Sequence, residues 1–297
     1  MKAKYALIFL LVLLFLSTKQ INGQSSSMIN TKTSTFIDNA LIECIYKYTI
    51  NAPLRNSSSD KLTEIYNTIL QANGSVSKFW DWHSFKKDSI INSSPEQLSN
   101  DSINKLTWKY NLKVKDLFVS VILKNHPKEK ITVTDEIVPN NFIYEENKNG
   151  YNWMLRDDTL TVCGYLCYKS VCSFGGREWT AWYAPEINIS DGPWKLYGLP
   201  GLILKAEDST GTHSFEAVAI RQSTRPIYIA KNKLQIKTGK EQFIKSKNLF
   251  EEDPERSLST SPQIQNITVL KDFGTLLIDG KRASINAMRG YSPLELE

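Results

Sequence analysis

Short runs of alternating apolar and polar residues, rich in β-branched and aromatic side chains, recur along most of this chain between turn-forming residues. These runs lie at 40–50, 64–72, 76–85, 107–124, 130–138, 151–157, 160–168, 177–184, 202–208, 212–221 and 264–270. Alternation with a period of two places successive side chains on opposite faces of a strand. Short strands joined by turns pair antiparallel, and a bent or closed sheet protects its edges. The sequence therefore predicts a mainly β fold: an antiparallel, strongly bent sheet or incomplete barrel, with one or two short helices.

The helical candidates are few. Residues 238–248 start with Thr-Gly-Lys-Glu, which can cap a helix, place Phe243 and Phe250 at roughly helical spacing, and are followed by Pro254. Residues 60–70 fit either a helix or a strand. Segments rich in Ser, Asn, Asp and Pro are predicted to be exposed loops, and these are 51–60, 88–105 and 252–263.

Two turn signals bracket a short aromatic segment at residues 190–204. The first is Asp191-Gly192-Pro193. The second, at residues 199–202, fits a type II turn in which Pro200 presets φ and Gly201 supplies a positive φ. The hexapeptide that contains this turn and runs into an apolar strand consists of Gly198, Leu199, Pro200, Gly201, Leu202 and Ile203.

This hexapeptide, with Gly175-Gly176-Arg177 and Ala181-Trp182 before it, resembles the signature of the GLPGLI family, secreted proteins known mainly from Bacteroidota. Residues 164–170 resemble the family's Gly-Tyr-x-Cys-x-Lys-Ala, and residues 292–295 resemble its closing Asn-Pro-Ile/Leu-Glu. The resemblance implies one β-rich domain over residues 36–297 and a strand pair over residues 64–85. The biochemical role of the family is not established, so the resemblance implies no reaction.

The N-terminus has the pattern of a secretory signal. Lys2 and Lys4 precede an apolar run over residues 6–16, and a polar stretch leads to Gln24. The run is too short to span a bilayer, which needs about 20 residues, and no cysteine follows it for lipoprotein processing. We expect residues 1–24 to be removed, residues 25–35 to be flexible, and the protein to be exported, periplasmic or secreted, without a transmembrane segment.

The charge balance argues against a nucleic-acid partner. The formal net charge is +5, but Lys2, Lys4 and Lys19 leave with the signal, and the remaining chain is nearly neutral. Nucleic-acid binders carry clustered Lys and Arg, whereas here the clearest basic pair is Lys86-Lys87.

Four cysteines follow the signal: Cys44, Cys163, Cys167 and Cys172. An even number in an oxidising compartment favours disulfides. Zinc is the alternative, but paired C-x-x-C motifs are absent and the histidines, His83, His126 and His213, lie elsewhere in the sequence. The sequence indicates no metal and no cofactor. The family resemblance implies a Cys167–Cys172 disulfide, because these cysteines often occur together in the family, with Cys44–Cys163 as the second pair.

Common catalytic motifs, namely G-x-S-x-G, H-E-x-x-H, the P-loop and G-x-G-x-x-G, are absent from the sequence. The candidate ligand-binding residues are aromatic and charged: Arg177, Trp179, Trp182, Asp191, Trp194 and Lys195. Trp beside Arg or Lys can stack on flat ligands or hold carboxylates and phosphates. The alternative is structural: the Trp side chains fill the core, and Arg177 pairs with a buried acid, Glu145 or Asp208. Asp208 itself most simply starts a hairpin turn.

Three functions fit these observations. The first is a noncatalytic, envelope-associated binding protein whose bent sheet holds a lipidic, peptidic or other small ligand, or which binds an envelope protein. The second is an exported hydrolase that uses carboxylates such as Glu145, Asp158 and Asp191. The third is a structural or interaction module with an exposed apolar patch. The first is favoured because the sequence carries aromatic residues on strands but no catalytic motif.

Overall fold

The computed structural model describes residues 28–296 apart from 31–33, 56, 94–96, 100, 107–117, 231–234, 260–263, 265, 271–274, 280, 287–288 and 291. The predicted signal peptide, residues 1–24, and residues 107–117 of one predicted strand lie outside the described residues. Within the part of the chain that is described, no helix is long and apolar enough to cross a membrane.

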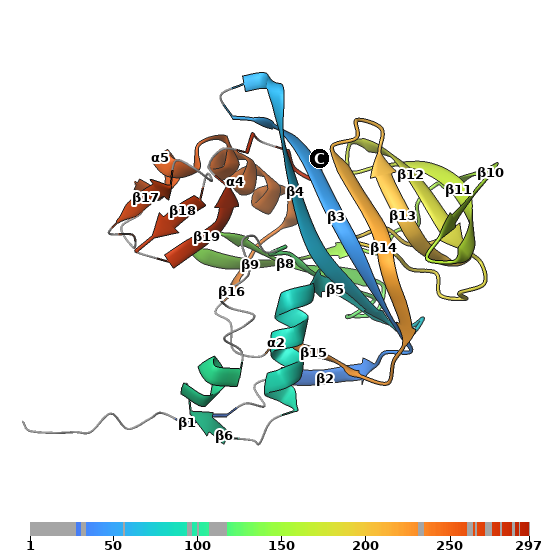
Figure 1. Cartoon of the computed structure of the whole chain (residues 1–297), viewed down its shortest axis with the longest axis horizontal. Helices are drawn as coiled ribbons and strands as arrows, with labels where there is room; N and C mark the ends of the chain where they lie inside the picture. Colours follow the sequence, from blue (N-terminus) through green and yellow to red (C-terminus); the bar gives the residue numbers. More distant parts are fainter. Residues whose placement is uncertain are drawn as a thin grey trace, which may run out of the picture.

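One large sheet dominates the molecule (Figure 1). From edge to edge it contains β10 (Met154–Val162), β11 (Tyr165–Phe174), β12 (Arg177–Ala184), β13 (Leu202–Asp208), β14 (His213–Gln222), β3 (Ile42–Leu54), β4 (Ser57–Ala72), β5 (Ser77–Asp81), β7 (Val121–Lys124), β8 (Lys130–Ile137), β9 (Asn140–Asn147) and β16 (Gln235–Lys237). Neighbours are antiparallel except β16, which runs parallel to β9. The sheet bends so that β8 and β9 cross the direction of β3 and β4, and it does not close (Figure 1). This confirms the predicted fold class.

Smaller elements surround this sheet. Two-stranded pairs join β1 (Met28–Asn30) to β6 (Gln97–Ser99) and β2 (Ser34–Asn39) to β15 (Pro226–Ala230). A three-stranded sheet contains β17 (Ile267–Leu270), β18 (Thr275–Ile278) and β19 (Lys281–Asn286). The helices α2 (Trp82–Asn92), α4 (Lys240–Glu252) and α5 (Pro254–Ser259) pack around these sheets, and residues 101–106 are also helical. Residues 28–30 and 34–35, in the segment expected to be flexible, thus form β1 and the start of β2.

The helix predicted over residues 238–248 is confirmed as α4, and residues 60–70 belong to β4. The three predicted loops are wrong, because 51–60 contains the end of β3 and the start of β4, 88–105 contains the end of α2, and 252–263 contains α5. Side-chain caps explain both helices. Asp81 accepts a hydrogen bond from the Ser84 amide at 2.7 Å, and Asp253 accepts one from the Arg256 amide at 3.1 Å. Such caps stabilise polar helices that have little apolar periodicity.

The core lies on the inner face of the bend. Tyr46, Phe79, Trp179 and Phe215 are each at most 1% exposed. Their rings meet mostly edge to face or tilted, for example Phe79 and Phe215 with centroids 5.9 Å apart at 80°. This aromatic packing fills the concave side of the central strands and anchors the site described below.

The cysteine pairing that the family resemblance implied is partly wrong. Cys167 and Cys172 lie on one strand, β11, so their Cα atoms are separated by about 16 Å, whereas a disulfide needs about 7 Å or less. The hairpin turn is formed instead by Cys163 and Gly164, with φ of 50° and 83°, as a two-residue type I′ turn requires. All four cysteines are free thiols here. Burial raises the pKa of the Cys44 thiol, and nearby Cys163 raises it further; their pairing stays a prediction.

The edge strand β10 carries a bulge. Leu155 pairs with Ser170 and Thr159 pairs with Tyr168, so three residues of β10 face one residue of β11. Residues 154–161 are all exposed. The bulge therefore falls in the middle of an exposed sheet edge.

Candidate functional site

A buried lysine organises the segment between β12 and β13, residues 185–201. The Lys124 ammonium at the end of β7 donates to the carbonyl oxygens of Gly192, Trp194 and Leu196 at 2.7, 3.0 and 3.3 Å. It also forms an ion pair with Asp191. Burial lowers the pKa of Lys124, and the Asp191 carboxylate opposes this shift. The loop is thus folded around one cation. The sequence does contain a signal for this buried cation, which the sequence analysis missed. Lys124 directly follows the apolar residues Val121, Ile122 and Leu123 at the end of β7.

The turn in the hexapeptide differs from the expected type II turn. The Gly201 amide donates to the Leu199 carbonyl at 2.8 Å, which makes a tighter, three-residue turn centred on Pro200. The prediction of a positive φ at Gly201 is confirmed, at 149°. An ideal Cβ on this glycine would lie 2.3 Å from the Ala184 carbonyl oxygen. The backbone of β12 therefore passes too close for any side chain.

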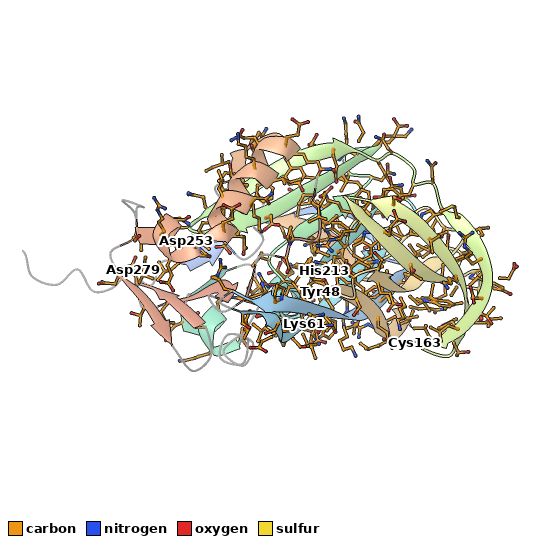
Figure 2. All side chains as sticks on the ribbon, turned by 90° about the horizontal axis from the view of Figure 1, so that it is seen from above. Tyr48, Lys61, Cys163, His213, Asp253 and Asp279 are labelled. Carbon is orange, nitrogen blue, oxygen red and sulfur yellow. The ribbon has the colours of Figure 1, made fainter. Side chains whose placement is uncertain are left out.

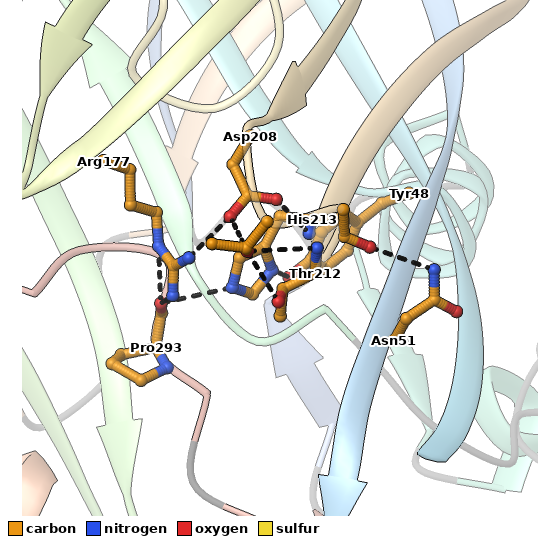
Figure 3. Close-up of polar contacts among 9 residues, drawn as sticks. Tyr48, Asn51, Arg177, Asp208, Thr212, His213 and Pro293 are labelled. Carbon is orange, nitrogen blue, oxygen red and sulfur yellow. Dashed lines mark hydrogen bonds and ion pairs between the residues drawn. The ribbon is translucent and has the colours of Figure 1, made fainter.

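A polar network centred on Asp208 links three strands to the C-terminus (Figure 3). Arg177, the first residue of β12, places Nη1 2.6 Å from Asp208 Oδ2 and donates through Nη2 to the Pro293 carbonyl at 2.6 Å. Asp208 also accepts from the His213 amide at 2.7 Å and from the Thr210 hydroxyl. Burial alone would raise the pKa of Asp208, but these hydrogen bonds and the nearby cation hold it below its usual range. Asp208 is the buried acid that pairs with Arg177, and it ends β13 at a hairpin turn as predicted.

The tautomer of His213 follows from its neighbours. A carbonyl oxygen can only accept, so His213 Nε2, 3.2 Å from the Pro293 carbonyl, carries the proton. Nδ1 then accepts from the Tyr48 hydroxyl at 2.8 Å. Burial, reinforced by the Arg177 cation, lowers the pKa of His213 to about 3. Figure 2 shows Tyr48 and His213 together in the interior. His213 is therefore a neutral connector between β3 and the C-terminal segment.

Residues 292–296, called here the C-terminal strap, cross this region and end at a second network. Glu295 lies 2.5 Å from the Lys195 ammonium and 2.6 Å from that of Lys240. Lys195 also contacts Glu146 at 2.6 Å and is only 1% exposed. Two lysines and two glutamates thus neutralise one another. Sequence reasoning named Lys195 but missed its partners, because they come from β9, α4 and the strap.

A cavity of about 180 Å³ lies between the concave face of the sheet, α4 and the C-terminal strap. We call it the α4 cavity. Its apolar wall includes Tyr66, Phe118, Val133, Tyr144, Phe243 and Phe250. The lysines and the arginine in its wall are held in ion pairs, for example Lys247 with Asp135 at 2.6 Å and Arg289 with Glu64 at 2.9 Å. The cavity therefore offers aromatic surface with locally balanced charge.

The predicted ligand-binding residues do not form one platform. Trp194 and Lys195 line the α4 cavity, whereas Arg177, Trp179, Trp182 and Asp191 are not in its walls. Trp179 is buried with its ring centroid 5.7 Å from that of Trp194. The Trp182 ring has the Lys169 ammonium 5.7 Å from its centroid. The structural role proposed for the Trp residues thus fits Trp179, and ligand contact by Arg177, Trp182 or Asp191 stays a prediction.

The carboxylates considered for hydrolysis lie on separate elements with separate partners. Glu145 is an exposed residue of β9, Asp158 pairs with Lys169 at 3.4 Å beside the bulge of β10, and Asp191 pairs with Lys124. Across the described ranges, no group of three or more His, Cys, Asp or Glu is placed to hold a metal ion. The geometry therefore gives no particular support to the hydrolase alternative.

Comparison with known proteins adds a family match over this region. A family model described as "Protein of unknown function (Porph_ging)" matches residues 175–205. This range contains β12, the loop at residues 185–201 that folds over the Lys124 side chain, and the start of β13. No curated protein matches the chain.

Two solved structures are similar to the chain at low identity. "Structure of PNGF-II in P21 space group" has 14% identity and a TM-score of 0.46, covering 69% of this chain and 33% of that chain. "Structure of PNGF-II in C2 space group" has 14% identity and a TM-score of 0.43, covering 69% and 32%. The chain thus spans about a third of the length of these structures.

Proposed function

We propose that this chain is an exported, noncatalytic binding protein of the GLPGLI family that holds a small apolar or amphipathic ligand, such as a short lipid chain, in the α4 cavity. The observation that carries the proposal is the aromatic wall of this cavity, formed by residues from β4, β8, β9 and α4. Pockets for small molecules are concave and mostly apolar, with a few placed polar groups. The family match at residues 175–205 and the N-terminal pattern support the family and export parts.

The charge pairing favours an uncharged ligand group. Lys195, Lys247 and Arg289 each have an acidic partner within 3 Å. A charged ligand would have to displace one of these partners, whereas an apolar group displaces only water. A peptide would bring backbone donors and acceptors, which are costly to bury without partners. A lipidic ligand is therefore favoured over a peptidic one.

The volume sets the size of the ligand. About 180 Å³ holds roughly six water volumes, less than the ~300 Å³ at the lower end of common ligand sites. We infer that one ring or the end of an acyl chain enters, while the rest of a longer molecule stays outside. An exported protein with such a site would act in the envelope, binding lipid-like molecules there.

Native mass spectrometry of the protein purified from its own exporting cells tests this proposal. Ile244, on α4, lines the cavity, whereas Leu249 on the same helix is 60% exposed. We expect a copurifying small molecule that is lost in Ile244→Trp, which fills the cavity, and retained in Leu249→Trp. Absence of any bound molecule after exposure to short-chain fatty acids, or equal retention in both variants, would contradict the proposal.

A further inference from the structure

A second pocket lies on the opposite, outer face of the sheet. On β5 the side chain of Phe79 joins the inner core, so Lys78 and Trp80 face outward. There α2 packs Phe85 against Trp80, their ring centroids 5.9 Å apart. The strand β15 lies beside α2 (Figure 1). Between these elements is a hollow of about 420 Å³, called here the α2 pocket, which shares no lining residue with the α4 cavity.

The charged residues of the α2 pocket are mostly basic. Lys78, Lys86 and Arg225 line it, against a single acidic side chain, Asp88. The Lys78 ammonium is already engaged, because it donates to the Tyr228 carbonyl at 2.9 Å and lies 3.3 Å from the centroid of the Trp80 ring. This buried lysine ties β15 to β5 and adds positive potential beneath the pocket.

Lys86 and Arg225 differ from the paired cations of the α4 cavity. Among the residues that the structure describes, neither forms an ion pair. Each lies near an aromatic ring instead: Lys86 is 5.2 Å from the Trp82 centroid, and Arg225 is 5.6 Å from that of Phe85. Such contacts position a cation without neutralising its charge. The Lys86 ammonium and the Arg225 guanidinium are thus both able to bind an anion.

We propose that the α2 pocket binds an organic anion built on a flat ring, in the simplest case an aryl carboxylate. The carboxylate would be held by Arg225, whose planar guanidinium matches it in a bidentate fashion, and by Lys86. The ring would pack between α2 and β15, beside Phe85 and Tyr228. The α4 cavity suits an uncharged group, so the two pockets would accept different classes of molecule.

Calorimetric titration with two probes of the same ring and opposite charge tests the site. We expect 1-naphthoate to bind with a Kd at least tenfold lower than 1-naphthylmethylammonium, and its affinity to fall as salt rises. In the double variant Lys86→Gln/Arg225→Gln the Kd for naphthoate should rise at least tenfold. The matched control is Arg156→Gln, which changes an exposed arginine on β10 and should leave the Kd within twofold.

Three results would overturn this assignment: no naphthoate binding by the wild type, equal affinity for both probes, or a double variant within twofold of Arg156→Gln. Lys86 and Arg225 are not buried, so the double variant should melt like the control, which separates lost binding from lost fold. The variant Ile244→Trp, which fills the α4 cavity, shows which of the two pockets naphthoate occupies. Binding lost there but kept in the double variant would place naphthoate in the α4 cavity and refute the α2 pocket as its site.

Discussion

Replacing Gly201 by alanine tests how closely the hexapeptide turn packs on β12. The glycine has a φ of 149°, and an added Cβ would meet the Ala184 oxygen at 2.3 Å, its carbonyl carbon at 2.6 Å and Pro185 Cα at 2.8 Å. All three atoms belong to the backbone, so no rotamer change can relieve the contact. Either β12 or the turn must move.

The expected cost has two parts. A non-glycine residue in a sparsely populated backbone region costs about 1–3 kcal/mol, and overpacking a filled site costs typically about 1–3 kcal/mol. Gly201→Ala should therefore lower the free energy of unfolding by about 2–6 kcal/mol. For a chain of this size each kcal/mol moves the melting temperature by roughly 2–4 °C, so a decrease of at least about 4 °C is expected.

Gly211→Ala is the matched control. Gly211 also has a positive φ, 67°, but an added Cβ there would meet nothing within 4 Å. Its substitution carries only the backbone cost of the left-handed conformation, about 1–2 kcal/mol. Urea denaturation followed by tryptophan fluorescence would compare the two. If Gly201→Ala lies within ~0.5 kcal/mol of Gly211→Ala, the steric reasoning is refuted, and a partner contact becomes the better reason for the motif.

Arg177→Ala should destabilise the protein by about 3–5 kcal/mol, because it leaves the fully buried Asp208 carboxylate without its cation; a urea midpoint equal to wild type would contradict this. Lys124→Met should cost a similar amount by the same measurement, since its carboxylate partner and carbonyl acceptors lose their cation. His213 has a folded pKa of about 3 against 6.5 unfolded, so the unfolded chain binds more protons between these values. The free energy of unfolding should therefore fall by about 1.4 kcal/mol per pH unit below about pH 6, and His213→Gln should remove this slope above pH 5. Peptide mapping without reduction should find Cys44 linked to Cys163 in protein produced in an oxidising compartment; free thiols at both would refute that pair.

Local signals in the sequence were enough for much of the fold. Alternating segments predicted the antiparallel sheet, spaced Phe side chains predicted α4, and Asp208 marked a hairpin turn. The expected side-chain cap of α4 is not formed, because its N-cap residue is Gly239. The positive φ of Gly201 also followed from its place after a proline. These features depend on neighbours in the chain, so a single sequence contains them.

The site depended on contacts between distant segments. Arg177 had two possible acidic partners, and the choice of Asp208 rests on the register in which Trp179 of β12 faces Asp208 of β13. Lys124 reaches carbonyl groups about seventy residues away along the chain, from Gly192 to Leu196. Every residue has a backbone carbonyl oxygen, so the amino-acid sequence does not indicate which carbonyl groups will accept a hydrogen bond from a lysine. Neither cluster could therefore be read from composition or spacing.

The bulge in β10 has a consequence for the behaviour of the protein at high concentration. The edge it interrupts exposes Met154, Leu155 and Leu160, which on a flat strand would invite pairing with another chain. Residues 156–158, Arg-Asp-Asp, occupy the bulge and break the row of backbone donors and acceptors. At the far edge, β16 is only three residues long. A bulged edge at one side and a very short strand at the other both disfavour edge-to-edge pairing of this sheet with a second copy.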